Sequence, residues 1–468
     1  MDTPELHGQE KLEEVTRLLD ILKRDFGERR LERARRIEVL QKLRVHGRKP
    51  ENAGPIFEKE GIDVLSSYGF GEKDVEISRE ALRCLANALF LEKETRQIFV
   101  DLGNGHKAAE KLKEDNSDDE FLAARLLFFT TYGSNLDFNK LFDEHALGES
   151  MNNHIYRHSK QFSKGKKKEL TQIDELGLSE TLKLMYNVTS YYPDQVDAFS
   201  PSIPHILKIL NHIEIPTPPL QAPVNYLINA LLNLDLEAKK TNHFSTNPLF
   251  PKFDQNCNVD KLINILDQAV AVHKPSHLDT LALPLLTLLR KIYDIAPEGP
   301  RKYMEWLLLP DDSERDLPIG QSHTLSSRLL RLSTSPVAPQ LREGISALMF
   351  ELSGRNASDF VRNVGYGFAA GFLMSHNMSI PETAKEAFST RPTKPGEQPV
   401  PINPITGQRL DAEPQDTGPP MTMEEKEREA ERLFVLFERL RATGVVNVEN
   451  PVKTALSEGR FEELDDLD

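Results

Sequence analysis

Apolar positions along this chain recur with the spacing of one face of an α-helix. In five segments an apolar group stands at a first position, called p, and again at p+3, p+4 and p+7. A sixth, weaker copy carries Glu120 at p. Strand-like alternation is nearly absent, so the pattern predicts an all-α protein. The five full copies, in one of which the methyl of Thr189 serves as the apolar group, are Leu82–Leu85–Ala86–Leu89, Leu182–Met185–Tyr186–Thr189, Val224–Leu227–Ile228–Leu231, Leu285–Leu288–Leu289–Ile292 and Ile345–Leu348–Met349–Leu352.

Position p+5 of each copy points away from the apolar face. A polar residue there is expected in any amphipathic helix. Three asparagines and two arginines in six copies form a more specific pattern, because asparagine is a poor helix former. The six residues are Asn87, Arg125, Asn187, Asn229, Arg290 and Phe350.

The spacing of these copies predicts a repeat array. Successive p+5 positions are separated by 38, 62, 42, 61 and 60 residues. The shorter intervals match an armadillo or HEAT unit of roughly 40 residues, and the longer ones predict inserted segments. We expect insertions at 154–169 and 239–258, and a proline-rich turn at 214–223 that keeps the next helix from starting earlier. Residues 1–390 are therefore predicted to form an armadillo/HEAT-like right-handed superhelical solenoid whose inner helices line a concave groove.

The C-terminal part has a different character. Residues 391–421 are predicted to be an extended linker, because eight prolines and three glycines fall in its first thirty positions. An amphipathic helix is expected over 422–445, where Thr422 and Glu425 have the spacing of a capping box. The acidic stretch 446–468 is expected to be disordered.

Composition excludes several classes of protein. The formal charge of −15 argues against a general nucleic-acid coat protein, which needs cations to neutralise phosphates. Two cysteines, Cys84 and Cys257, cannot build a disulfide framework or a four-thiolate zinc site. The acidic start does not resemble a signal peptide, and no apolar run approaches the ~20 residues of a membrane span. We therefore expect a cytoplasmic protein with no direct membrane insertion.

Motifs for chemistry are weak. No GxxxxGK[ST] loop is present, and the glycines of 365–371 favour close packing at a helix junction over a phosphate loop, since no βαβ pattern surrounds them. His154 and His158 have a metal-ligand spacing but lack the glutamate of a metalloprotease. Lys164 and the lysines at 166–168 indicate either a solvated loop or a nuclear import signal. The sequence predicts no catalytic residue, metal or cofactor.

A basic block lies near the start of the predicted solenoid. Residues 23–49 carry eleven lysines and arginines against four acids. The block is either a solvated helix face or an electropositive end of the groove that attracts a carboxylate or an acidic helix.

Three motifs near the C-terminus resemble a known family, the synembryns. They are the GRN…GYGFAAG segment within 348–377, NPITG at 403–407, and the MTMEEKEREAERLFVLFERL helix at 421–440. Weaker similarity extends the resemblance over roughly residues 35–445, and the likeness is to fungal rather than animal members.

This resemblance implies a cytosolic exchange factor and folding chaperone for heterotrimeric G-protein α subunits (Gα), without covalent chemistry. It implies a monomer that grips the C-terminal helix of GDP-bound or nucleotide-free Gα in the groove, while the C-terminal segment embraces the Ras-like domain. Recruitment to the cell cortex through Gα is also implied. The alternative is a helical-repeat adaptor that binds peptides without exchange activity.

The resemblance also implies residues of the binding site. Arg44 and Arg48 match basic contacts to the Gα tail, and Asn87 matches an asparagine of the groove. The repeat geometry extends this set by three residues, which are Arg125, Asn187 and Asn229.

Overall fold

A computed structural model describes the protein at residues 6–162, 170–237, 247–378, 400–403, 406–413 and 422–442. The chain divides into two compact units, residues 1–412 and 413–468.

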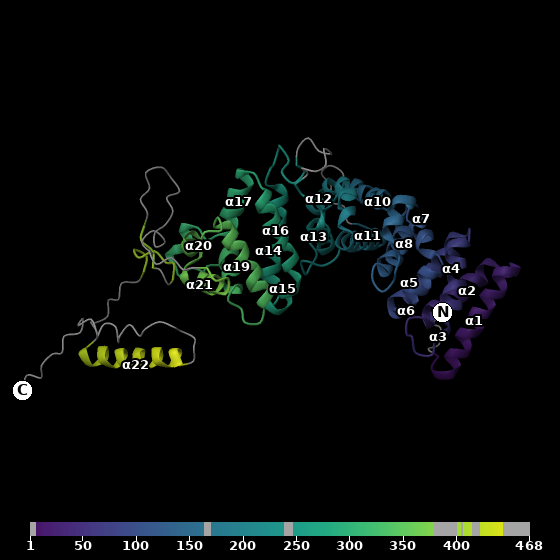
Figure 1. Cartoon of the computed structure of the whole chain (residues 1–468), viewed down its shortest axis with the longest axis horizontal. Helices are drawn as coiled ribbons and strands as arrows, with labels where there is room; N and C mark the ends of the chain where they lie inside the picture. Colours follow the sequence, from purple (N-terminus) through teal and green to yellow (C-terminus); the bar gives the residue numbers. More distant parts are fainter. Residues whose placement is uncertain are drawn as a thin grey trace, which may run out of the picture. The chain divides into compact units, whose positions relative to one another are not determined.

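The first unit is built on a row of helices that pack one against the next along its length (Figure 1). We call it the third-helix row, because most members are the last helix of a three-helix repeat. Its members are α2 (Arg33–His46), α5 (Val75–Leu91), α8 (Ser117–Thr130), α11 (Gln172–Tyr191), α13 (Val224–Asn233), α16 (Leu283–Ile295) and α19 (Pro339–Leu352).

A second row packs behind the first, again with each helix touching the next. It comprises α1 (Gly8–Glu28), α4 (Lys59–Gly71), α7 (Asn104–Lys111), α9 (Phe138–His145), α10 (Leu147–Gln161), α12 (Ile203–His212) and α14 (Cys257–Val272). The remaining elements of this unit are α3 (Gly54–Phe57), α6 (Glu94–Asp101), η1 (Pro193–Ser202), α15 (Pro275–Leu281), α17 (Glu298–Leu308), η2 (Asp312–Asp316), α18 (Leu325–Leu332), α20 (Ala357–Val364) and α21 (Tyr366–Ser375).

The repeated apolar template explains why the third-helix row forms. All five full copies lie on its helices, and every template side chain is buried except Tyr186, which is half-buried. Side-chain caps set several starts, since Asp74, Asn116 and Thr171 accept hydrogen bonds from the first-turn amides of α5, α8 and α11. The prediction of an all-α solenoid of the armadillo type is confirmed.

The first predicted insertion is partly wrong. Residues 154–161 belong to α10, and His154 and His158 are buried rather than solvated. A buried carboxylate, Glu120, stands opposite both rings, so two residues counted as polar occupy the core-facing side of a helix. The proline-rich turn is placed as expected, because α12 ends at His212 and α13 begins at Val224.

Part of the predicted linker also differs from expectation. Residues 400–403 and 406–412 pack against η2 and the turn that follows it, with an isolated antiparallel bridge between Ile402 and Arg409. Ile402 is buried. The contacts join residues about 90 positions apart, which the proline content of the segment does not reveal.

The second unit contains α22 (Met423–Ala442), which lies within the predicted 422–445 helix. The capping box is confirmed, because the amides of Thr422 and Glu425 each donate to the other's side chain. The predicted tail, 446–468, lies outside the described residues.

Candidate functional site

Five of the six candidate residues lie on helices of one structural element, the third-helix row. Arg48 is exposed just after the end of α2, and the other five are half-buried. Neighbouring helices of the row pack against each other (Figure 1), so we expect equivalent repeat positions to fall along one side of the row. In chain order the other five are Arg44 on α2, Asn87 on α5, Arg125 on α8, Asn187 on α11 and Asn229 on α13.

The arginines at the α2 end differ in how they are held. Arg44 Nη1 lies 3.2 Å from Glu80 Oε2, and the same buried carboxylate lies 2.8 Å from Arg83 Nη1. Arg44 Nε is buried and has no hydrogen-bond partner among the described residues. Arg48 makes no side-chain ion pair within the part of the chain that the structure describes. Of the two candidate arginines at this end, Arg48 is therefore the more available to a ligand.

Arg125 is held at the centre of an aromatic surface. Its Nη1 donates to Glu180 Oε1 of α11 at 2.7 Å. Its guanidinium carbon lies 5.9 Å from the ring centroid of Phe90 and 5.2 Å from that of Phe129. Lys183 continues this surface, with Nζ 4.9 Å from the Phe128 ring centroid. Cation–π contact and the ion pair together orient Arg125 while leaving it partly exposed.

The three asparagines differ in whether their side chains already make a hydrogen bond within the protein. Asn187 Nδ2 donates to Thr131 Oγ1 at 2.7 Å, so this side chain joins α11 to the end of α8. Asn87 and Asn229 make no side-chain hydrogen bond with any residue that the structure describes. Their amides can donate to and accept from a ligand, whereas that of Asn187 is already engaged.

Two exposed aromatic residues on this row were missed by the sequence reasoning. Phe90 on α5 is 57% exposed and Tyr191 at the end of α11 is 58% exposed. A signal for Phe90 was present, because it stands at p+8 of its copy, on the same side of the helix as p+5, and Phe128 stands at p+8 of the sixth copy. Exposed aromatic rings beside fixed cations suit an amphipathic helix better than a small polar ligand.

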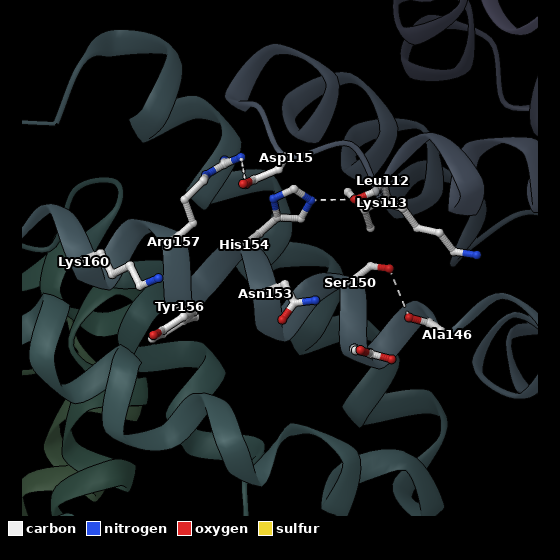
Figure 2. A pocket seen from close by; sticks show the side chains of 11 residues that line it. Leu112, Lys113, Asp115, Ala146, Ser150, Asn153, His154, Tyr156, Arg157 and Lys160 are labelled. Atoms are coloured by element: carbon white, nitrogen blue, oxygen red, sulfur yellow. Dashed lines mark hydrogen bonds and ion pairs between the residues drawn. The ribbon is translucent and has the colours of Figure 1, made fainter.

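A cleft of about 750 Å³ lies elsewhere, between the end of α7 and α10. Figure 2 shows His154 directed at the carbonyl of Leu112 and Arg157 directed at Asp115. Lys113 on its rim pairs with Glu110. These basic groups are engaged within the protein, and none of the six candidate residues lines the cleft.

Among the described residues, no group of three or more His, Cys, Asp or Glu side chains is arranged to hold a metal ion. None of the described helices combines the length and apolar character that a membrane crossing requires.

Comparisons with known proteins indicate the same family as the three C-terminal motifs. The family model described as guanine nucleotide exchange factor synembryn matches residues 39–460. The chaperone Ric-8A of Xenopus tropicalis is 26% identical over 489 residues, covering 94% of this chain and 87% of that protein. A synembryn-like chaperone of Schizosaccharomyces pombe is 30% identical over 167 residues, which are 34% of this chain and 32% of that protein. A designed armadillo repeat protein aligns with a TM-score of 0.38 and 12% identity, over 62% of this chain and 99% of its own.

Proposed function

Since the chain belongs to the synembryn family, we propose that it is a guanine nucleotide exchange factor and folding chaperone for heterotrimeric G-protein α subunits. The family model names exchange activity, and the relatives reported above are named chaperones. Both activities follow from one binding energy, without covalent chemistry.

The binding site is the exposed side of the third-helix row from α2 to α13, and its ligand is the C-terminal helix of Gα. The observation that carries this assignment is the contact of Arg125 on α8 with the exposed ring of Phe90 on α5, in the row whose preceding helix, α2, is followed by the exposed Arg48. An amphipathic helix buries its apolar face on such rings. Its terminal carboxylate then pairs with an arginine, whose planar guanidinium forms two parallel bonds to a carboxylate.

Exchange follows from selective binding. Gα bound to GDP samples a minor state in which its C-terminal helix is displaced and the nucleotide site is loosened. A surface that binds this state more tightly than the closed one shifts the population toward it, and GDP leaves. By linkage, GTP binding to the closed state must weaken the complex. The same surface shields the apolar helix of newly made, nucleotide-free Gα.

The C-terminal segment makes a second contact with Gα. The helix α22 (Met423–Ala442) contacts the Ras-like domain of the same Gα while the solenoid holds its C-terminal helix. Two linked contacts on one partner raise the overall affinity above that of either alone, because the second contact forms within the complex.

The test is release of fluorescent GDP from a purified Gα subunit with and without the full chain. The intact protein should accelerate release, and Arg48→Glu should weaken binding by roughly tenfold, the ~1.5 kcal/mol expected for one charge-assisted contact. Arg24→Glu is the matched control, because Arg24 is an exposed arginine of α1 with no side-chain ion pair among the described residues.

The outcomes separate the alternatives. Binding of Gα without any acceleration of release would identify a helical-repeat adaptor and refute the exchange proposal. If release is accelerated but Arg48→Glu and Arg24→Glu behave alike, the function stands and the assignment of Arg48 is wrong.

A further inference from the structure

Residues 400–403 and 406–412, which we call the strap, are attached to the end of the solenoid. Two of the hydrogen bonds that attach it join backbone groups on both sides, and a third is donated by the side chain of Gln408. The bonds are Ile319 N to Thr406 O at 2.9 Å, Arg409 N to Arg315 O at 2.8 Å, and Gln408 Nε2 to Asp316 O at 2.9 Å.

The buried guanidinium of Arg315 reinforces the attachment. Its Nη1 donates to the carbonyl of Gly407 at 3.0 Å. Its Nη2 donates to the carbonyls of Arg362 at 2.7 Å and Asn363 at 3.3 Å. These two carbonyls belong to the last turn of α20, where a helix has no partners of its own. One side chain thus joins η2, the end of α20 and the strap.

The strap is shaped to lie close to the solenoid. Gly407 has a φ of +66°, and a Cβ atom at this position would overlap Ile319 Cδ1. Asn403 closes the turn, because its side-chain oxygen accepts from Thr406 N at 3.2 Å and its carbonyl accepts from Gly407 N at 2.8 Å. Asn403 and Gly407 therefore both give the strap the shape that this attachment requires.

We infer that the strap is a positioning device for α22 and that Arg315 and Gly407 are positioning residues for Gα binding. With the strap attached, about ten residues separate Ala412 from Thr422, and a chain of that length spans at most ~35 Å. With the strap released, about 44 residues separate Met378 from Thr422 and span up to ~150 Å. The attachment shortens the tether without adding a contact to the partner.

The size of the effect follows from tether length. The effective concentration of a tethered group falls with about the −3/2 power of the length of a random chain, so release lowers it roughly ninefold. This inference rests on the proposed function, since α22 is taken to contact the Gα held by the solenoid. Arg315→Met or Gly407→Val should then weaken binding of nucleotide-free Gα by about that factor.

Hydrogen exchange tests the attachment without Gα. Gly407→Val should accelerate exchange of the Ile319 and Arg409 amides, because both donate across the attachment. Gly354→Val is the matched control, because Gly354 has a φ of +70° and open space around it. Unchanged exchange in both Gly407→Val and Arg315→Met overturns the attachment itself.

A longer tether in the full chain separates positioning from general damage. Inserting about 34 Gly and Ser residues after Asp416 makes the tether long whether or not the strap is attached. Gly407→Val should then cost about twofold in Gα affinity instead of about ninefold, because the tether grows from about 44 to about 78 residues. A substitution that merely damages the fold costs the same factor in both backgrounds.

The outcomes distinguish the two proposals. If the intact chain does not bind Gα, the proposed function fails. If it binds Gα, two results overturn the positioning role alone. Either Gly407→Val leaves the affinity for Gα unchanged, or it lowers that affinity by the same factor with and without the insert.

Discussion

Nε2 of His158 and Oε2 of Glu120 lie 2.8 Å apart, and both side chains are fully buried. Thr181 Oγ1 donates to the other carboxylate oxygen at 2.8 Å, and Arg157 Nη2 also pairs with Glu120. Gly177 leaves room for the carboxylate, since a Cβ there would lie 2.8 Å from Glu120 Oε2. One acidic side chain therefore joins α8, α10 and α11, at the copy of the repeat where the apolar template is broken.

Glu120→Gln should lower the free energy of unfolding by about 3 kcal/mol, because removing one partner leaves buried charge uncompensated. Urea denaturation of both proteins at neutral pH measures the difference. Glu149→Gln, at an exposed position of α10, is the control and should change stability by no more than ~0.5 kcal/mol. Equal stabilities for wild type and Glu120→Gln would show that the cluster contributes nothing.

Stability should fall on acidification. Burial lowers the pKa of His154 below its ordinary 6.5, so the unfolded chain takes up this proton first and stability declines as pH drops below about 6.5. Burial opposes ionisation of Glu120, but the His158 hydrogen bond and nearby positive charges hold its pKa below 4.5. Its contribution is present above pH 4.5 and is lost as pH falls through the lower folded pKa.

The His154 contribution is testable by substitution. His154→Gln should reduce the loss of unfolding free energy between pH 7 and pH 5, measured by urea denaturation at each pH. The groups that face this ring are Glu120 on α8, Arg157 and His158 on α10, and the carbonyl of Leu112. His323→Gln, at an exposed position, should leave the loss unchanged. A loss that is the same in wild type and in both variants contradicts the prediction.

The exposed aromatic residues of the third-helix row should carry binding energy. Phe90→Ala and Tyr191→Ala are each expected to weaken Gα binding about tenfold, the ~1.4 kcal/mol typical of an aromatic anchor. Melting temperatures should change little, because more than half of each side chain is exposed. Titration calorimetry with nucleotide-free Gα measures the loss. Trp306→Ala, at a 62% exposed aromatic on α17, is the control.

The two cysteines should differ in reactivity toward a thiol reagent. Cys84 is buried, with Sγ 3.4 Å from the carbonyl of Leu40, and burial raises the pKa of its thiol to about 12. Cys257 is only half-buried. In the native protein we expect Cys257 alone to react, and in Cys257→Ser we expect no labelling until denaturant is added. Native labelling of Cys84 would mean that α2 and α5 separate readily.

Helix identity and the order of repeats were readable from the chain. The apolar template predicted α5, α11, α13, α16 and α19, because burying a 3.6-residue periodic face is a local requirement of each helix. The p+5 rule also placed candidate residues on one row, because equivalent positions of stacked repeats align.

Tertiary packing decided which polar side chains pair between neighbouring helices. Arg125 and Asn187 have the same repeat position, yet one meets Glu180 and the other meets Thr131, both on neighbouring helices. In the sequence Glu120 only interrupts an apolar template. In the structure it contacts Thr181 and the two histidines. The sequence of the strap has the character of a linker. In the structure Arg315, about 90 residues away, donates to the carbonyl of Gly407.

The physical reason is the range of each interaction. Periodicity reports which side of a helix leaves water, a property of residues three and four positions apart. Which polar groups then form hydrogen bonds with one another depends on chain segments that meet only after the helices have stacked. No local sequence pattern encodes which distant segments will meet.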